Sequence, residues 1–322
     1  MLEGIPSYGD MQCVLLEVEQ SSRFLEEERR VLQLVAKGAS IRDVLDTLTT
    51  AIERMAPGCF CSILLLDEDR RRLRAGAGGS LPQDYMRLVD GLEIGPDVGS
   101  CGSAAFCNQT VIVSDIATDY RWAAAKELPL GFGLRACWSV PIRDSKDGVL
   151  GTFAMYHQSP ATPDPQDLAI VEAGAYLAGK AIERLTSDRK LREAVERLRL
   201  AEEAAGFGVW ELDIPSDTVL LSEGAAVLNG LPRDTARANG SELSQLIHPD
   251  DRLANSAAME LAIRQGQGYQ VEFRVMLPDG THRWCRAKGR PEFAGGQARR
   301  VIGAIIDAVS YTHLTLPTNR EV

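Results

Sequence analysis

Thiols are the side chains of this sequence best suited to chemistry, and one of them follows a glycine-rich turn. Cys101 stands directly after Gly95-Pro96-Asp97-Val98-Gly99-Ser100 and begins a run of small residues that predicts a helix. A glycine-rich loop that opens a helix can present backbone N–H groups to an anion. The strings GxxxxGK[ST] and GxGxxG are absent. Two interpretations stay open: a small polar or anionic ligand near Ser100 and Cys101, or a tight turn with close helix packing, which we favour.

Cys59 and Cys61 form a second possible thiol site. Residues two apart in a strand point to the same face, so these thiols suggest a redox pair or half of a metal site. The sequence holds no second ligand pair at metal-binding spacing. We therefore interpret them as small buried hydrophobic side chains and predict no metal site. The chain has seven cysteines without the paired spacing of a disulfide framework, which fits free thiols in a reducing compartment.

The charge balance argues against a nucleic-acid partner. The 322 residues include 35 Lys and Arg against 45 Asp and Glu, for a net charge of −10. Binding to phosphates needs clustered basic residues instead. No apolar run reaches the roughly 20 residues that span a bilayer, and acidic residues interrupt the start of the chain, unlike a signal peptide. We predict a cytoplasmic protein, whose longer parent could still be tethered to a membrane.

The first half of the chain predicts a sheet flanked by helices. Residues 24–36 and 41–55 repeat apolar side chains every three or four positions, as amphipathic helices do. Ser40 is a predicted N-cap with Asp43 three residues later, and Pro57-Gly58 ends the helix. The continuous apolar run 59–66 predicts a central strand with both faces covered. Further strands are predicted at 111–113, 135–142 and 149–156.

Four motifs in this half resemble a bacterial GAF domain of the kind found upstream of histidine kinase and cyclic di-GMP output domains. They are the turn and helix 95–106, the strand 111–116, the segment 133–142 and the strand 148–156. The resemblance covers residues 24–185 and implies a GAF domain at 22–186, with an α+β fold and a ligand pocket. By position in the family, the pocket candidates are Ser100, Cys101, Asp115, Trp122, Arg135 and Trp138.

The resemblance also bears on cofactors. Phytochrome-like GAF domains attach a bilin through a cysteine that commonly adjoins a histidine, and this chain has no Cys-His dipeptide. The signature of cyclic-nucleotide GAF domains is absent too. His157 could ligate haem, as in some GAF sensors, but a solvated histidine is the simpler interpretation. We therefore expect no covalent bilin and no haem, and the ligand stays unknown. A reductase of free methionine sulfoxide shares the fold and uses reactive cysteines, so it is the rival enzyme class.

A long helix is predicted from Pro165 to Ala205. Its first part carries an apolar seam from Leu168 to Leu185, which resumes at Leu191, Val195 and Leu198 after a spacing of six residues instead of seven. Such a slip rotates the apolar stripe around the helix. We predict that the first part packs on the sheet, and that residues 187–203 form a coiled-coil linker through which Leu191, Val195 and Leu198 face a parallel homodimer partner.

The second half resembles a PAS domain of the type widespread in bacterial sensor kinases. The resemblance rests on His248-Pro249-Asp250-Asp251 and on Asp279-Gly280-Thr281-His282-Arg283-Trp284, and it implies a PAS domain with an antiparallel sheet at 204–308. Asp279-Gly280 predicts a hairpin turn, and Pro249 followed by acidic residues predicts a helix start. The cysteine motif of flavin-photoadduct domains is absent, so no flavin adduct is expected.

Residues 309–322 depart from the PAS pattern and resemble a translated adaptor or vector tail, with a divergent natural tail as the alternative. Residues 1–21 are a polar lead-in. The sequence lacks a phospho-acceptor histidine box, ATP-lid motifs and GGDEF or EAL strings, so no catalytic residue is predicted. We expect a GAF-PAS input module of a truncated sensor histidine kinase, whose missing kinase would address a response regulator. A diguanylate cyclase or phosphodiesterase parent, or a stand-alone binding module, are the alternatives.

Overall fold

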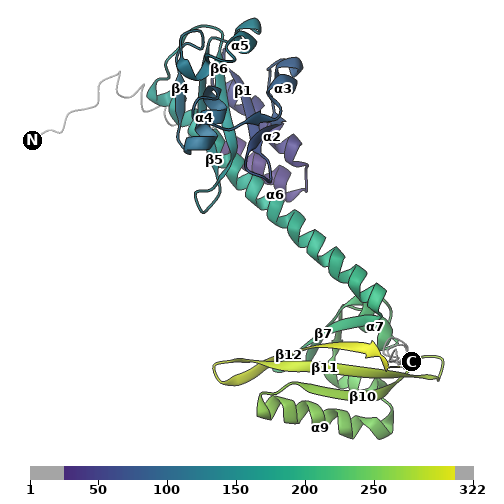
Figure 1. Cartoon of the computed structure of the whole chain (residues 1–322). Helices are drawn as coiled ribbons and strands as arrows, with labels where there is room; N and C mark the ends of the chain where they lie inside the picture. The colour runs from purple at the N-terminus through teal and green to yellow at the C-terminus, as the bar shows by residue number, and fades with distance from the viewer. Residues whose placement is uncertain (1–24, 309–322) are drawn as a thin grey trace, which may run out of the picture. The chain divides into compact units, whose positions relative to one another are not determined.

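The computed structural model describes residues 25–308, which divide into two compact units after Lys190 (Figure 1). The predicted lead-in 1–21 and tail 309–322 lie outside the described residues. Within residues 25–308, no helix combines the length and the apolar character needed to cross a membrane. The predicted boundaries of the GAF domain, the linker and the PAS domain at residues 22, 187 and 204 stay predictions.

The first unit is built on a six-stranded antiparallel sheet with the strand order β3-β2-β1-β6-β5-β4. A helix that includes residues 25–36 precedes its numbered elements. Those elements are α2 (Ile41–Met55), β1 (Phe60–Leu66), β2 (Arg72–Ala77), α3 (Gln83–Val89), β3 (Leu92–Glu93), α4 (Gly99–Cys107), β4 (Val111–Val113), the 3₁₀ turn η1 (Tyr120–Trp122), α5 (Glu127–Gly131), β5 (Ala136–Arg143), β6 (Val149–His157) and the first part of α6 (Pro165–Ala205), whose residues after Lys190 belong to the second unit. The predicted central strand is β1, which pairs with β2 and β6.

The start of α2 follows the predicted capping pattern. The Ser40 hydroxyl oxygen accepts the N–H of Asp43 at 3.2 Å and donates to the Asp43 carboxylate at 2.7 Å. These bonds satisfy a backbone donor that has no partner within the helix. The helix ends at Met55, just before Pro57. The Ser40 cap prediction is therefore confirmed.

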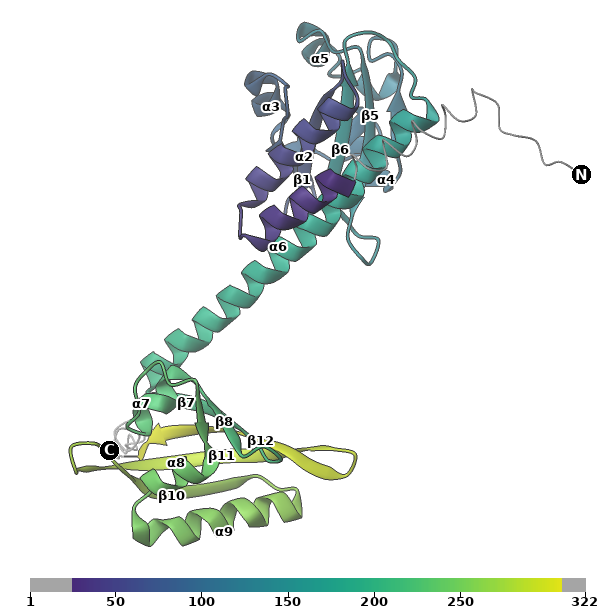
Figure 2. The ribbon, with the colours of Figure 1, turned by 180° about the vertical axis from the view of Figure 1, so that it is seen from behind.

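Two hydrophobic cores lie on opposite faces of the first unit's sheet. One core joins the sheet to residues 25–36, α2 and the first part of α6, which Figure 2 shows lying together over the strands. The other core joins the opposite face to α3 and α4 and to the segment that carries η1 and α5. Helices thus cover both faces, which explains why β1, β5 and β6 lack polar residues on a solvent-facing side.

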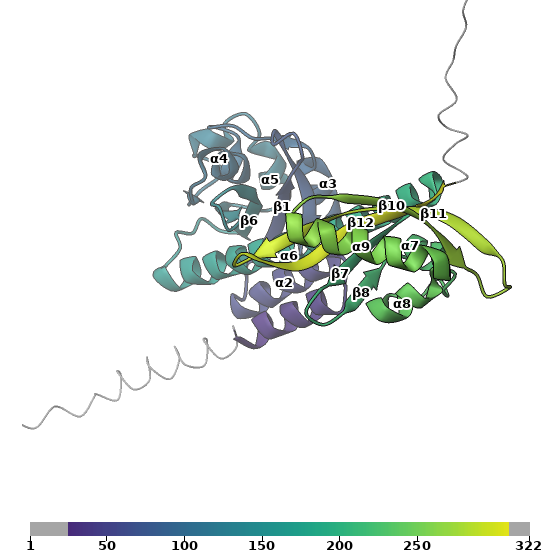
Figure 3. The same cartoon turned by 90° about the horizontal axis from the view of Figure 1, so that it is seen from below.

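The second unit also has a six-stranded antiparallel sheet, in the order β10-β11-β12-β7-β8-β9. Its elements are β7 (Phe207–Asp213), β8 (Thr218–Leu221), α7 (Glu223–Leu228), β9 (Arg237–Asn239), α8 (Gly240–Leu246), α9 (Pro249–Gln265), β10 (Tyr269–Met276), β11 (His282–Ala294) and β12 (Gln297–Asp307). Figure 3 shows α7, α8 and α9 along this sheet. A single core of residues from the strands and helices fills the space between them.

The two motifs singled out in the second half hold this fold. Gly280 adopts a φ of 84° in the turn between β10 and β11, so the predicted hairpin is confirmed. Pro249 begins α9 as predicted, and His248 caps it by accepting the N–H of Asp250. Asp251 accepts hydrogen bonds from the Arg274 backbone N–H at 2.9 Å and from its Nε at 2.8 Å, which fastens α9 to β10. The molecule as described is an α+β protein.

Candidate functional site

The two central strands β5 and β6 present different chemistry on their two faces. In β5, Cys137 points to the side covered by α4, whereas Trp138 and Val140 point to the side covered by α2 and α6. Ser139 shares the face of Cys137 because side chains alternate along a strand. In β6, Tyr156 lies on the α4 side and Phe153 on the α6 side. The α4 side is therefore lined with small polar groups, and the α6 side is apolar.

These polar groups gather beneath α4 in what we call the thiol–hydroxyl cluster. Every member is at most 3% exposed, and two thiols lie among four hydroxyls. The members are Tyr85, Cys101, Cys137, Ser139, Thr152 and Tyr156.

Cys101 is the centre of the cluster. Its Sγ lies 3.7 Å from the hydroxyl oxygen of Tyr156. The neighbouring thiol of Cys137 is the largest cause that lowers the pKa of Cys101, to about 7. Burial, by contrast, raises the pKa of Cys137 and of Tyr156. Hydrogen bonds directed at a thiolate stabilise it, so within the cluster Cys101 is the sulfur that ionises first.

Several hydroxyls of the cluster lack a hydrogen-bond partner in the part of the chain that the structure describes. The hydroxyl oxygens of Tyr85, Ser139 and Thr152 are buried, and none has a hydrogen bond of normal length and angle with any described residue. Ser139 and Thr152 nevertheless lie near enough to the Cys101 sulfur to lower its pKa further. Leaving a buried hydroxyl unpaired costs roughly 1–3 kcal/mol. Three such groups near one thiol therefore leave hydrogen-bonding capacity unused beneath α4.

Three of the predicted pocket residues meet at this cluster. Ser100 donates its hydroxyl to the backbone oxygen of Cys137 at 3.1 Å and accepts the indole N–H of Trp122 at 3.1 Å. These two bonds fix the first turn of α4 against β5 and hold Cys101 over the cluster. Ser100 and Trp122 are 0% and 7% exposed, so in this state both serve the packing around the thiol.

The other three predicted pocket residues lie apart from the cluster. Asp115 and Arg135 form a partly exposed ion pair, in which Arg135 Nη2 lies 3.0 Å from each carboxylate oxygen. Trp138 lies on the α6 face and donates its indole N–H to the backbone oxygen of Ala161 at 3.1 Å. The ring of His157 lies 4.4 Å from that of Trp138, and burial lowers the pKa of His157. Their roles in ligand binding stay predictions.

The sequence candidates missed five members of the cluster. These are the hydroxyl residues Tyr85, Ser139, Thr152 and Tyr156 and the second cysteine, Cys137. The available signal is the alternation within β5, where small polar Cys137 and Ser139 interleave with large apolar Trp138 and Val140. Their meeting with Cys101 depends on how α4 folds over the sheet, which no local pattern in the sequence reveals.

A wider groove of about 850 Å³ lies between α2, β2 and α3. Its lining mixes both charge signs, including Arg42, Asp46, Arg87 and Asp90, with the backbone of Gly76–Gly79. None of the buried unpartnered oxygens of the described residues lines it. The groove therefore gives less indication of a specific guest than the cluster does. In residues 25–308, no group of three or more His, Cys, Asp or Glu side chains is placed to hold a metal ion.

On the opposite face of the same strands, α6 packs unusually closely. A Cβ atom added at Gly179 would lie 2.4 Å from the backbone oxygen of Arg143 at the end of β5, and one at Gly174 would lie 3.1 Å from Phe153. Ala175 and Ala178 of α6 are buried in the same core as Trp138. Small residues thus bring the helix backbone almost onto the sheet. A shift of β5 or β6 caused by a change in the cluster would therefore alter the packing of α6.

The apolar stripe further along α6 is exposed. Leu191, Val195 and Leu198 are 65%, 60% and 48% exposed. They follow one another at intervals of four and three residues, which places them on one face of the helix.

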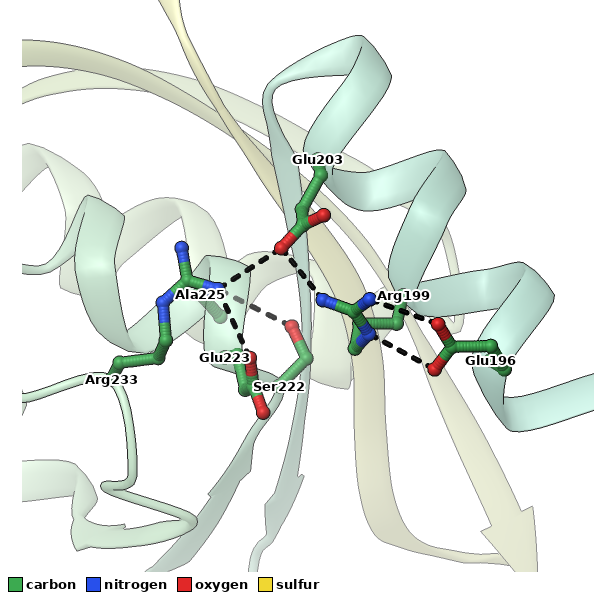
Figure 4. A network of polar contacts seen from close by, with 7 residues as sticks. All are labelled: Glu196, Arg199, Glu203, Ser222, Glu223, Ala225 and Arg233. Carbon is green, nitrogen blue, oxygen red and sulfur yellow. Dashed lines mark hydrogen bonds and ion pairs between the residues drawn. The ribbon is translucent and has the colours of Figure 1, made fainter. Parts of the chain in front are cut away.

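The last turns of α6 belong to the second unit and pack there through a chain of ion pairs, drawn in Figure 4. Arg199 donates to Glu196 and, at 2.8 Å, to Glu203. Glu203 also accepts from Arg233 at 3.0 Å, and Arg233 lies 3.2 Å from Glu223 at the start of α7. We call these five residues the charge ladder. It connects α6 to α7 and to the segment after α7.

A buried contact lies beside the charge ladder. Glu202 of α6 is 5% exposed and accepts the backbone N–H of Val209 in β7 at 3.1 Å. The same N–H also donates to Ser222, which caps α7. A Cβ added at Gly208 would lie 2.0 Å from the backbone nitrogen of Ala225, so β7 and α7 touch through their backbones. The end of α6 is therefore fastened to the sheet and to α7 together.

The second unit has a small open pocket of about 130 Å³ between its sheet and α8 and α9. Most of the lining is apolar, and polar groups come from Asn229, Ser244, Asn255 and Tyr269. Burial raises the pKa of Tyr269. The space would admit a few waters or a very small molecule.

Comparison with known proteins agrees with this architecture. The GAF domain profile matches residues 38–183, and the PAS fold profile matches residues 219–305. The methyl sulfide methyltransferase-associated sensor of Methanosarcina acetivorans is 34% identical over 197 residues, which are 59% of this chain and 20% of that protein. Sensor protein FixL of Bradyrhizobium diazoefficiens is 32% identical over 113 residues, which are 35% of this chain and 22% of that protein.

One solved structure among those similar to this chain is that of a sensory box histidine kinase/response regulator from Burkholderia thailandensis. It is 26% identical, covers 36% of this chain and 88% of that one, and has a TM-score of 0.32. The chain matches only about a fifth of the length of the two curated relatives. Both family profiles fall on the units described above, in the predicted order. The chain is thus a sensor module that consists of a GAF domain followed by a PAS domain.

Proposed function

We propose that this chain is the cytoplasmic input part of a bacterial sensor histidine kinase. In this proposal, a small-molecule or redox cue acts at the thiol–hydroxyl cluster of the GAF domain. The signal then passes through α6 and the PAS domain to a C-terminal kinase, which phosphorylates a response regulator. The support for this proposal is that two sensor-type domains are joined by one uninterrupted helix, Pro165–Ala205.

The observation that carries the relay is the two-sided use of β5 and β6. These strands bear the cluster on one face and the packing surface of α6 on the other. A guest can shift a conformational equilibrium only by its differential affinity for two states. A guest that satisfies the hydroxyls of Tyr85, Ser139 and Thr152 would favour a different strand position, and the close contact at Gly179 would pass this difference to α6.

We further propose that the module acts as a parallel homodimer. The exposed stripe of Leu191, Val195 and Leu198 is the surface that a second copy of α6 would cover. Its spacing of four and three residues is that of a coiled-coil seam. Two parallel copies would bring the same residues together and would connect the two relays.

The dimer is tested by sedimentation of Val195→Glu. A charge at the centre of the seam would be buried without a partner, so we expect the 35.1 kDa monomer in place of a dimer. Leu253→Glu is the matched control, because Leu253 is 82% exposed on α9, outside the proposed seam. A Val195→Glu chain that dimerises as the wild type does would contradict this interface.

The output class is tested by a long read of the source DNA across the codon for Asp307. A continuous frame with a histidine box and ATP-binding motifs would support the kinase. GGDEF or EAL motifs would assign the same module to a diguanylate cyclase or phosphodiesterase instead. A stop codon at this point would overturn the kinase proposal in favour of a stand-alone binding module.

A further inference from the structure

We propose that Cys101 and Cys137 are a redox-sensitive thiol pair, which a peroxide converts into a disulfide between α4 and β5. This inference rests on the proposed sensory function and names the chemistry of its cue. The two residues are 36 positions apart in the sequence and belong to different elements, yet both are in the thiol–hydroxyl cluster.

The contacts around the two sulfurs place them together. The hydroxyl of Ser100, the residue before Cys101, donates a hydrogen bond to the backbone oxygen of Cys137 at 3.1 Å. Cys137 is paired directly with Tyr156 across β5 and β6, and the Tyr156 hydroxyl lies 3.7 Å from the Cys101 sulfur. Each thiol also shifts the pKa of the other, which is consistent with neighbouring sulfurs. Both thiols are free in this structure.

The cluster supplies the groups that peroxide chemistry needs. A thiolate is the reacting form, and the side chains around Cys101 lower its pKa, which favours the thiolate at this sulfur. The unsatisfied hydroxyls of Ser139 and Thr152 near this sulfur could hydrogen-bond the oxygens of a small peroxide. Cys107, at the end of the same helix, is exposed to solvent.

The reaction balances in two steps. The Cys101 thiolate attacks one peroxide oxygen, so that an S–O bond forms, the O–O bond breaks, and hydroxide or alkoxide leaves with the electron pair and takes up a proton. The Cys137 thiol then attacks the sulfur of the resulting sulfenic acid. The S–S bond forms, the S–O bond breaks, and water leaves with the Cys137 proton. Two thiols are oxidised and one peroxide is reduced, and an added dithiol reverses the change.

The proposed disulfide has a direct route to α6. It would tie α4 to β5 at Cys137, whose neighbour Trp138 packs on the other face in the same core as α6. A bond at one residue of a strand thus changes the constraint on the next residue, which contacts the opposite layer.

The test is disulfide mapping of the whole reduced chain after treatment with hydrogen peroxide. Free thiols are then alkylated, and the digest is analysed by mass spectrometry. We expect a linked peptide pair containing Cys101 and Cys137, which disappears after dithiothreitol. In Cys137→Ser, we expect Cys101 to be trapped by dimedone as a sulfenic acid. Cys107→Ser is the matched control, because it removes an exposed thiol of the same helix and should leave the linked pair intact.

Two results would overturn the pair. One is oxidation of Cys107 while Cys101 and Cys137 both stay reduced, and the other is a link from either residue to a different cysteine. The mapping uses the wild-type chain, so it tests whether Cys101 and Cys137 form a disulfide even if a serine variant fails to fold. A chain without the disulfide that still forms the Val195-dependent dimer would refute the thiol pair and leave the proposed sensory function standing.

Discussion

Replacing Gly179 by alanine should lift α6 away from the GAF sheet. The added Cβ would lie 2.4 Å from the Arg143 backbone oxygen, whereas Cβ atoms in proteins essentially never come closer than 3.0 Å. The helix or the end of β5 must therefore shift by about 0.6 Å, the difference between these distances. Overpacking of this kind costs about 1–3 kcal/mol. Because alanine favours a helix over glycine by about 1 kcal/mol, the net loss of stability is about 1 kcal/mol at the middle of that range.

Calorimetry of the GAF transition measures this loss. A net change of about 1 kcal/mol lowers the Tm of a domain of this size by roughly 2–4 °C. Gly131→Ala is the control, because no atom lies within 4 Å of the Cβ it would add. We expect its GAF transition at or slightly above the wild-type temperature. A Gly179→Ala chain as stable as Gly131→Ala would refute the inference that α6 is seated tightly on the sheet.

Two further predictions concern the PAS domain. In the charge ladder, Glu203→Gln and Arg233→Gln should each destabilise the domain slightly. Their coupling in a double-mutant cycle should fade by about 1 M salt, where the Debye length is roughly 3 Å, and a salt-independent coupling would contradict an electrostatic link. The Arg274 guanidinium lowers the pKa of Asp251 to about 2, from 3.8. The unfolded chain therefore binds the Asp251 proton first, and the stability from this pair is complete above about pH 4 and is lost as the pH falls through 2. Asp251→Asn should flatten the pH dependence of urea unfolding in that window, and an unchanged slope would refute the link.

Sequence reasoning succeeded where the structural signal is local. The Ser40 cap, the Asp279-Gly280 turn and the Pro249 helix start each depend on a few neighbouring residues, and all three are present. The long helix has the predicted ends, Pro165 and Ala205, because no proline interrupts it between them. The order of the two domains followed from motifs that hold turns and helix starts.

The site was harder to predict because its members come from distant segments. Ser100 and Cys101 were found from the glycine turn, but Cys137 and Tyr156 reach Cys101 only through strand pairing. Trp138 was grouped with the pocket by its position in the family. The period of two in β5 turns it to the opposite face, where it packs with α6.

Coupling between α6 and the thiol–hydroxyl cluster is tested most directly by asking whether a substitution in α6 changes the accessibility of Cys101 on the other face of the sheet. The measurement is the alkylation rate of Cys101 by iodoacetamide in Gly179→Ala, with the exposed Cys107 as an internal reference and Gly131→Ala as the control. A net loss of about 1 kcal/mol predicts an increase of about fivefold in the exposure of Cys101 by local opening. We therefore expect faster alkylation of Cys101 and an unchanged rate at Cys107. Equal Cys101 rates in wild type, Gly131→Ala and Gly179→Ala would contradict coupling between the cluster and α6.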